Sequence, residues 1–162
     1  MRRILTLTLL LGAGGALGAT AAAAPTDPPP ETGTVSPPPA WVETAGGDRW
    51  LAFSSFCWTG TEGSNPPALC VDFIPPGMRD DVPRITLRRG QVVRFHLGFT
   101  PTRLTATVGK KTYRLHPREV AAWRVRGKGG TLLLDVRSES GDGASYVARL
   151  RIRPGAAPQP TP

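Results

Sequence analysis

Apolar residues recur at every second position in several short segments of this 162-residue chain. The clearest case is residues 91–99, where the apolar side chains that would share one face are Val93, Phe95, Leu97 and Phe99. The side chains of Arg94 and His96 would lie on the opposite face. This period of two is typical of a strand that packs one face on a core, and helical periodicity is nearly absent. The pattern therefore predicts an all-β fold.

Further segments with strand character lie between turns rich in glycine and proline. They are residues 49–58, 68–73, 84–88, 103–108, 111–115, 123–125, 131–137 and 145–153. We expect hairpins between residues 103–108 and 111–115, and between residues 123–125 and 131–137. About eight short strands with this spacing favour an antiparallel β-sandwich, Ig-like in architecture, with a small β-barrel as the alternative.

The first 24 residues carry the three parts of a secretory signal peptide. Two arginines are followed by an apolar run from Ile4 to Leu11 and by a slope of glycine and alanine that ends at Ala24. We expect cleavage after Ala24, which would make the protein secreted or associated with the cell envelope. The alternative is an uncleaved anchor, which would be the only contact of the chain with a membrane.

Proline divides the remainder of the chain into three parts. Residues 25–40 contain seven prolines, which block backbone donors and predict a disordered linker. Residues 154–162 have the same character and predict a disordered tail. The intervening residues 41–153 are expected to form the sandwich domain, because a segment of this size can bury a core.

Charge is distributed unevenly along the chain. Residues 25–81 contain two basic and eight acidic side chains, a net charge of −6, whereas residues 82–162 contain sixteen and four, a net charge of +12. Excess positive charge attracts polyanions, which for an exported protein are envelope polymers and anionic lipid headgroups. We therefore expect an anionic envelope polymer or a protein as the partner, and no nucleic acid.

Cys57 and Cys70 are the only cysteines, and they flank a turn-rich segment. In an exported chain such cysteines usually pair, and a zinc site would need four ligands. We expect a disulfide between neighbouring strands, with Trp58 as a lid over it rather than as an exposed binding aromatic. The pinned loop is also a candidate contact surface. Its candidate contact residues are Trp58, Glu62, Asn65 and Asp72.

The chain offers few groups for catalysis or metal binding. The alternative hypothesis, a metal-binding protein or an enzyme, would have to use His96, His116 or Asp72. A blue-copper site requires a free thiolate near histidine and methionine, which paired cysteines do not supply. The motifs G-x-S-x-G and H-E-x-x-H are absent from the sequence. We therefore expect no enzymatic activity, no metal and no cofactor.

Arginines on the last predicted strand are the stronger functional signal. The alternation of residues 145–153 would place Arg149, Arg151 and Arg153 on one face, and Arg94 lies on a similar water-exposed face. Guanidinium groups bind phosphate and carboxylate through paired hydrogen bonds, so these arginines are a candidate site for an anionic polymer or partner. The alternative is an edge strand that charge protects against self-pairing.

Three motifs within residues 50–99 belong together: SSFCWTG, LCVDF, and the pattern I-x-L-x-x-G-x-x-V-x-F in RITLRRGQVVRF. Together they resemble a group of small exported bacterial proteins, mostly uncharacterised, with a β-sandwich-like body. The resemblance implies bacterial export and a paired-cysteine hairpin, and it implies no activity. The favoured hypothesis is a non-catalytic exported module that binds an envelope component or a protein partner. A purely structural spacer domain is the remaining alternative.

Overall fold

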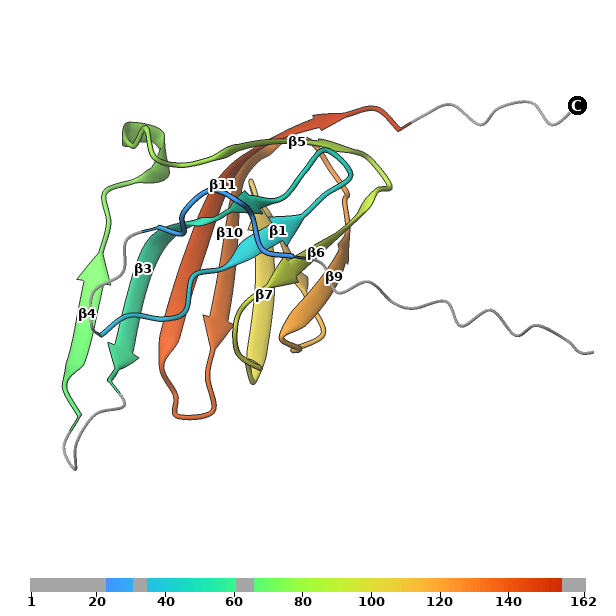
Figure 1. The fold of residues 1–162 in the computed structure, drawn as a ribbon. Coiled ribbons are helices and arrows are strands. Elements are labelled where there is room, and N and C mark those ends of the chain that lie inside the picture. Colours follow the sequence, from blue (N-terminus) through green and yellow to red (C-terminus); the bar gives the residue numbers. More distant parts are fainter. Residues whose placement is uncertain (1–22, 31–34, 61–65, 156–162) are drawn as a thin grey trace, which may run out of the picture.

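The computed structural model describes residues 23–30, 35–60 and 66–155 (Figure 1). These residues form eleven strands and one short 3₁₀ helix, η1 (Pro76–Met78). The strands are β1 (Trp41–Glu43), β2 (Arg49–Trp50), β3 (Ala52–Thr59), β4 (Ala68–Asp72), β5 (Arg84–Arg88), β6 (Val92–His96), β7 (Arg103–Val108), β8 (Lys111–Arg114), β9 (Val120–Arg124), β10 (Gly130–Arg137) and β11 (Gly143–Arg153). The all-β prediction is confirmed.

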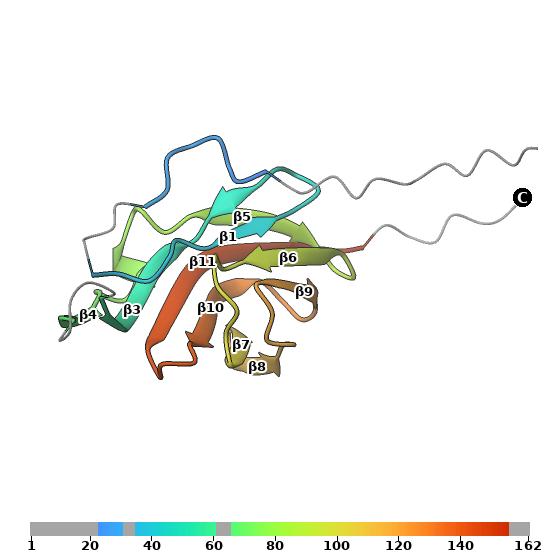
Figure 2. The ribbon, with the colours of Figure 1, turned by 60° about the horizontal axis from the view of Figure 1, so that its bottom comes forward.

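The strands belong to two sheets that pack together (Figure 2). The smaller sheet has the order β2-β1-β6-β9, and the larger has the order β4-β3-β11-β10-β7-β8 with β5 added beside β11. Within the described residues neither sheet closes on itself. The sandwich prediction is therefore confirmed, and the barrel alternative is wrong.

The long strand β11 is the centre of the larger sheet. One of its edges pairs with β10, while the other pairs first with β3 and then with β5. β5 runs parallel to β11, whereas the other strand pairs of the described residues are antiparallel. The predicted antiparallel sheets are thus confirmed. β5 adds a parallel pair, which the long crossover from β4 to β5 makes possible.

The main core lies between the two sheets and follows the predicted alternation. Val93 and Phe95 of β6 are buried while Arg94 is exposed, and Tyr146 and Leu150 of β11 are buried from the other side. The period of two thus assigned the core faces of these strands correctly. A second, smaller cluster lies on the outer face of the larger sheet, beneath the crossover from β4 to β5. It consists of Ala52, Val82 and Val147, with Leu133 against it.

The two expected hairpins have different outcomes. β7 and β8 pair across a turn at Gly109, whose φ of +60° favours glycine, so this hairpin is confirmed. β9 pairs with β6 in the smaller sheet, whereas β10 pairs with β7 and β11 in the larger sheet. The hairpin expected between residues 123–125 and 131–137 is therefore wrong, and the glycine-rich segment between them passes from one sheet to the other.

Packing of the domain begins before residue 41. Pro37 and Ala40 are buried, and the hydroxyl of Tyr146 donates a hydrogen bond to the carbonyl oxygen of Pro38 at 2.7 Å. The end of the proline-rich segment is thus part of the domain, beyond the boundary expected from sequence. Among the described residues, no helix has the length and apolar character needed to cross a bilayer.

Candidate anion-binding groove

The crossover between β4 and β5, residues 73–83, is fastened to the larger sheet by Arg79. This side chain is 7% exposed, and its Nη1 donates to the carbonyl oxygen of Phe53 at 2.5 Å. Its Nε and Nη2 donate to the two carboxylate oxygens of Asp81, and its guanidinium carbon lies 4.8 Å from the ring centroid of Phe73. The hydrogen bond from Arg79 lowers the pKa of Asp81, because it stabilises the ionised carboxylate.

Arg149 of β11 also binds the crossover, from the sheet that lies under it. Its Nη2 donates to the carbonyl oxygens of Pro76 at 2.8 Å and of Arg79 at 2.5 Å, and the side chain is partly buried. Arg149 is one of the anion-binding candidates predicted from the sequence. In the structure its guanidinium already bonds two backbone carbonyls, so its contribution to the fold is to position the crossover and therefore β5.

Parallel pairing of β5 with β11 brings two rows of arginines together. The register places Arg84 beside Arg149, Thr86 beside Arg151, and Arg88 beside Arg153. Neighbouring strands lie about 4.8 Å apart, so these outward side chains share one face. Arg84 and Arg88 were not among the predicted site residues. Their signal was present in RITLR, where Ile85 and Leu87 alternate with the polar positions, but the pairing with β11 could not be inferred from it.

A groove of about 590 Å³ runs between β5 and the turn that joins β1 to β2. Figure 1 and Figure 2 both show this turn beside β5. The basic side chains that line it are Arg49, Arg84, Arg88 and Arg153. The remaining lining includes Thr86 and Gln91 and, within the described residues, no acidic side chain. We call this feature the arginine groove.

Most of the guanidinium groups at the arginine groove are available to a ligand. Arg84, Arg88 and Arg153 are exposed, and within the described residues none of them forms an ion pair. Arg49 is also exposed, and its Nη1 donates to the carbonyl oxygen of Asp48 at 2.7 Å. Four cations that converge on one groove create a positive potential, which phosphate or carboxylate groups of a ligand would neutralise.

Arg94 lies apart from this cluster. It belongs to β6 in the smaller sheet, and its Nη1 forms an ion pair with Glu43 at 3.0 Å. Glu43 also contacts His96, whose Nε2 lies 3.2 Å from its other carboxylate oxygen. The ring of His96 stacks on Trp41 with the centroids 3.6 Å apart. The structure therefore places Arg94 and His96 in a polar cluster on the outer side of the smaller sheet.

The three candidate groups for metal binding or catalysis lie on separate elements. His96 is on β6, His116 is exposed in the segment after β8, and Asp72 ends β4 at the other margin of the larger sheet. Among the described residues, no three histidine, cysteine, aspartate or glutamate side chains are grouped as metal ligands. Asp72 instead lines a shallow hollow on the outer face of the larger sheet, next to Cys57 and Arg103.

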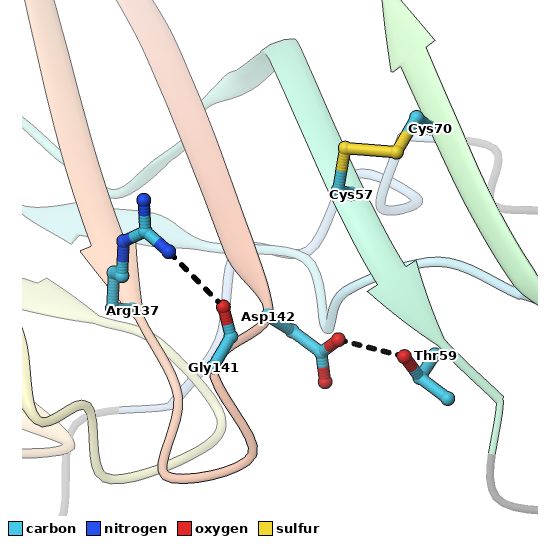
Figure 3. The surroundings of a disulfide bond; sticks show 6 residues. All are labelled: Cys57, Thr59, Cys70, Arg137, Gly141 and Asp142. Carbon is cyan, nitrogen blue, oxygen red and sulfur yellow. Dashed lines mark hydrogen bonds between the residues drawn. A yellow bond between two sulfur atoms is a disulfide. The ribbon is translucent and has the colours of Figure 1, made fainter.

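Cys57 and Cys70 form a disulfide between directly opposed positions of β3 and β4, as predicted (Figure 3). Both cysteines are exposed. Successive residues of a strand point to opposite faces, so Trp58 lies on the inner side, where its ring meets the ring of Phe99 edge-on at 5.3 Å. The expected lid over the disulfide is therefore wrong, since Trp58 and the sulfur atoms lie on opposite faces of the sheet. The candidate contacts Glu62 and Asn65 lie outside the described residues.

Comparisons with protein-family models, with curated proteins and with solved structures find no match to this chain.

Proposed function

We propose that this protein is a non-catalytic module that acts outside the cytoplasm and binds an anionic polymer of the cell envelope through the arginine groove. Export would follow from the N-terminal signal peptide. The observation that supports the binding role is the convergence of Arg49, Arg84, Arg88 and Arg153 on one groove that no acidic side chain of the described residues lines. The partner is a polymer that carries repeated phosphate or carboxylate groups, because guanidinium forks pair with both.

The rigidity of the groove supports specific binding over diffuse attraction by net charge. Its floor is a strand, and the crossover that leads to this strand is fixed by the buried contacts of Arg79 and Arg149. The backbone positions that carry Arg84 and Arg88 are therefore held in place before binding, which reduces the entropy lost on binding. A β-sandwich suits such a role, since loops and sheet edges of sandwiches commonly carry binding sites.

The test is binding of residues 25–162 to a phosphate polymer (polyphosphate) and to a carboxylate polymer (polygalacturonate), with dextran as the neutral polymer. The groove variant carries Arg84→Ala, Arg88→Ala and Arg153→Ala. The control variant carries Arg103→Ala, Arg114→Ala and Arg118→Ala, which are exposed arginines elsewhere and give the same change of net charge. Circular dichroism and thermal melting would verify that both variants keep the fold.

The groove variant should bind the anionic polymers about 3- to 150-fold more weakly, since it removes three exposed ion pairs that each contribute about 0.2–1 kcal/mol. The control variant should change the affinity less than about threefold, and binding of the wild type should weaken as salt is raised. Equal losses in the two variants would mean that net charge, and not the arginine groove, determines binding. Absence of binding to either anionic polymer would refute the proposed function.

A further inference from the structure

β4 forms an edge of the larger sheet, where one row of its backbone groups faces no other strand of the described residues. The amide of Phe73 donates to the carbonyl oxygen of Ser54 at 3.1 Å, and that of Gly60 donates to Pro67 at 2.8 Å. Antiparallel pairing alternates, so the odd-numbered residues of β4 bond to β3 and the even-numbered residues face away. The N–H and C=O groups that face away from β3 are therefore those of Ala68, Cys70 and Asp72. No strand of the described residues pairs with this edge.

The apolar side chains of this region are also uncovered. The exposed fractions are 42% for Leu69, 39% for Phe73, 60% for Ile74 and 77% for Met78. Figure 1 and Figure 2 both show β4 at the margin of the molecule, where the strands of the smaller sheet do not reach it. Exposed apolar residues beside a free strand edge are the usual features of a surface that pairs with another strand.

Other edges of the sandwich carry basic residues that oppose such pairing, whereas β4 carries none. At the far side of the same sheet β8 has Lys111 and Arg114, and the free edge of β5 has Arg84 and Arg88. Basic side chains on edge strands prevent edge-to-edge association. The stretch from Leu51 to Met78 contains no lysine or arginine, although the chain has 20 of them. Two basic molecules can therefore approach each other at β4 without opposing their cationic surfaces.

We propose that two copies of this chain associate through antiparallel pairing of β4 with β4 about a two-fold axis at Cys70. In this register Cys70 faces its own counterpart, Ala68 faces Asp72 of the second copy, and Leu69 faces Val71. All three residues with free backbone groups then lie in hydrogen-bonded positions, so six inter-chain hydrogen bonds form. No like charges stand opposite each other, and the apolar pair of Leu69 and Val71 occurs twice.

Local features favour this register and limit its length. The disulfide holds β4 on β3 before association. Little conformational entropy of β4 is therefore lost when the two copies pair. Pro66 has no N–H to donate, which ends the pairing one step before Ala68. A pair of five-residue strands buries less than the roughly 800 Å² per partner of a standard interface, so we expect a weak dimer that depends on concentration.

The proposed dimer does not require the proposed function to be correct. If both are correct, dimerisation affects polymer binding. Each copy carries one arginine groove, so a dimer presents two grooves to one polymer. Two linked sites raise the apparent affinity for a repeating ligand without any new contact. A polymer should therefore bind more tightly at protein concentrations that populate the dimer.

The test is sedimentation velocity of residues 25–162 from about 5 to about 500 μM, a range suited to a small interface. Ala68→Lys places a lysine opposite Asp72 of the second copy, twice per dimer, and should tighten the dimer about 2- to 30-fold. The double variant Ala68→Lys with Asp72→Lys places lysine opposite lysine and should loosen the dimer by a similar factor. Thr112→Lys, an exposed position on β8, is the control and should leave the dimer unchanged.

The sign of the response identifies the register, because both substituted positions are exposed and lie far apart within one monomer. If Ala68→Lys alone weakens the dimer as much as the double variant does, the register about Cys70 is wrong. If a dimer forms but neither Ala68→Lys nor the double variant alters it, the copies associate through another surface and the proposal fails. A wild-type chain that stays monomeric at about 500 μM also overturns it, and the edge of β4 is then left for a strand of a different protein.

Discussion

Replacement of Arg79 by methionine tests whether this one side chain fixes the crossover that carries β5. Methionine keeps an unbranched apolar stem in the buried position but cannot donate to the carbonyl oxygen of Phe53. A buried acceptor without a donor costs free energy, and a hydrogen bond from a charged donor contributes about 1.5–3 kcal/mol. This contact is therefore the largest part of the expected loss.

The other contacts of Arg79 add less. The carboxylate side chain of Asp81 is 61% exposed, so solvent screens this ion pair and it contributes about 0.5 kcal/mol. The contact with the ring of Phe73 adds about 0.5 kcal/mol at a partly exposed site. Relief from burying a guanidinium offsets part of this sum. We therefore expect Arg79→Met to lower the free energy of unfolding by about 2–3 kcal/mol.

The assay is urea unfolding at pH 7, with Arg118→Met as the matched control at an exposed position. For a domain of this size the expected loss corresponds to a fall of about 8–12 °C in Tm. The pKa of Asp81 is lowered from 3.8 in the folded state, so its contribution is present above pH 4 and is lost as the pH falls below that value. The difference in free energy of unfolding between wild type and variant should become slightly smaller in acid. It should not vanish, since the hydrogen bond to the carbonyl of Phe53 does not titrate. A loss below about 0.5 kcal/mol at pH 7 would refute this role of Arg79.

Three further changes probe the fold at separate points. Replacing both Cys57 and Cys70 by serine should lower the free energy of unfolding by about 3 kcal/mol in denaturant titrations, because the disulfide closes a loop with a sequence separation of 13 and is itself exposed. Tyr146→Phe should lower it by about 1 kcal/mol in the same assay, since the carbonyl of Pro38 loses its donor. Gly129→Ala should lower Tm by several degrees in a thermal melt, because an added Cβ would lie 2.5 Å from a backbone oxygen of β11; an unchanged Tm would mean that the two segments separate without cost.

Local alternation was sufficient to predict the faces of the strands but not their partners. Residues 91–99 and 145–153 were assigned to the correct core faces because the period of two is a property of each strand alone. Two strands joined by a glycine-rich connection can form a hairpin or belong to different sheets. Packing across the whole domain decides between these outcomes. The segment between β9 and β10 has the composition of a hairpin turn, and yet it joins the two sheets.

The same distinction explains what could be predicted of the candidate site. The alternation in β11 correctly placed Arg151 and Arg153 on one exposed face. The parallel partner β5 and the turn that brings in Arg49 depend on contacts distant in sequence, so three of the four arginines of the groove were not apparent. The two hydrogen bonds from Arg149 to the crossover could not be predicted for the same reason. No pattern in the sequence of the crossover places it over β11.

The acidic and basic halves of the sequence form different surfaces of the fold, and the two proposed interactions use different surfaces. The stretch without basic residues builds β3 and β4, whereas the basic half of the chain supplies β5 and β11. Contacts at the arginine groove depend on charge and weaken as salt screens them, with a Debye length of about 10 Å at 0.1 M. Contacts at the edge of β4 depend on backbone hydrogen bonds and apolar side chains, which salt does not weaken in this way. Raising the salt concentration should therefore release an anionic polymer while the dimer persists, and this difference separates the two proposals within one sample.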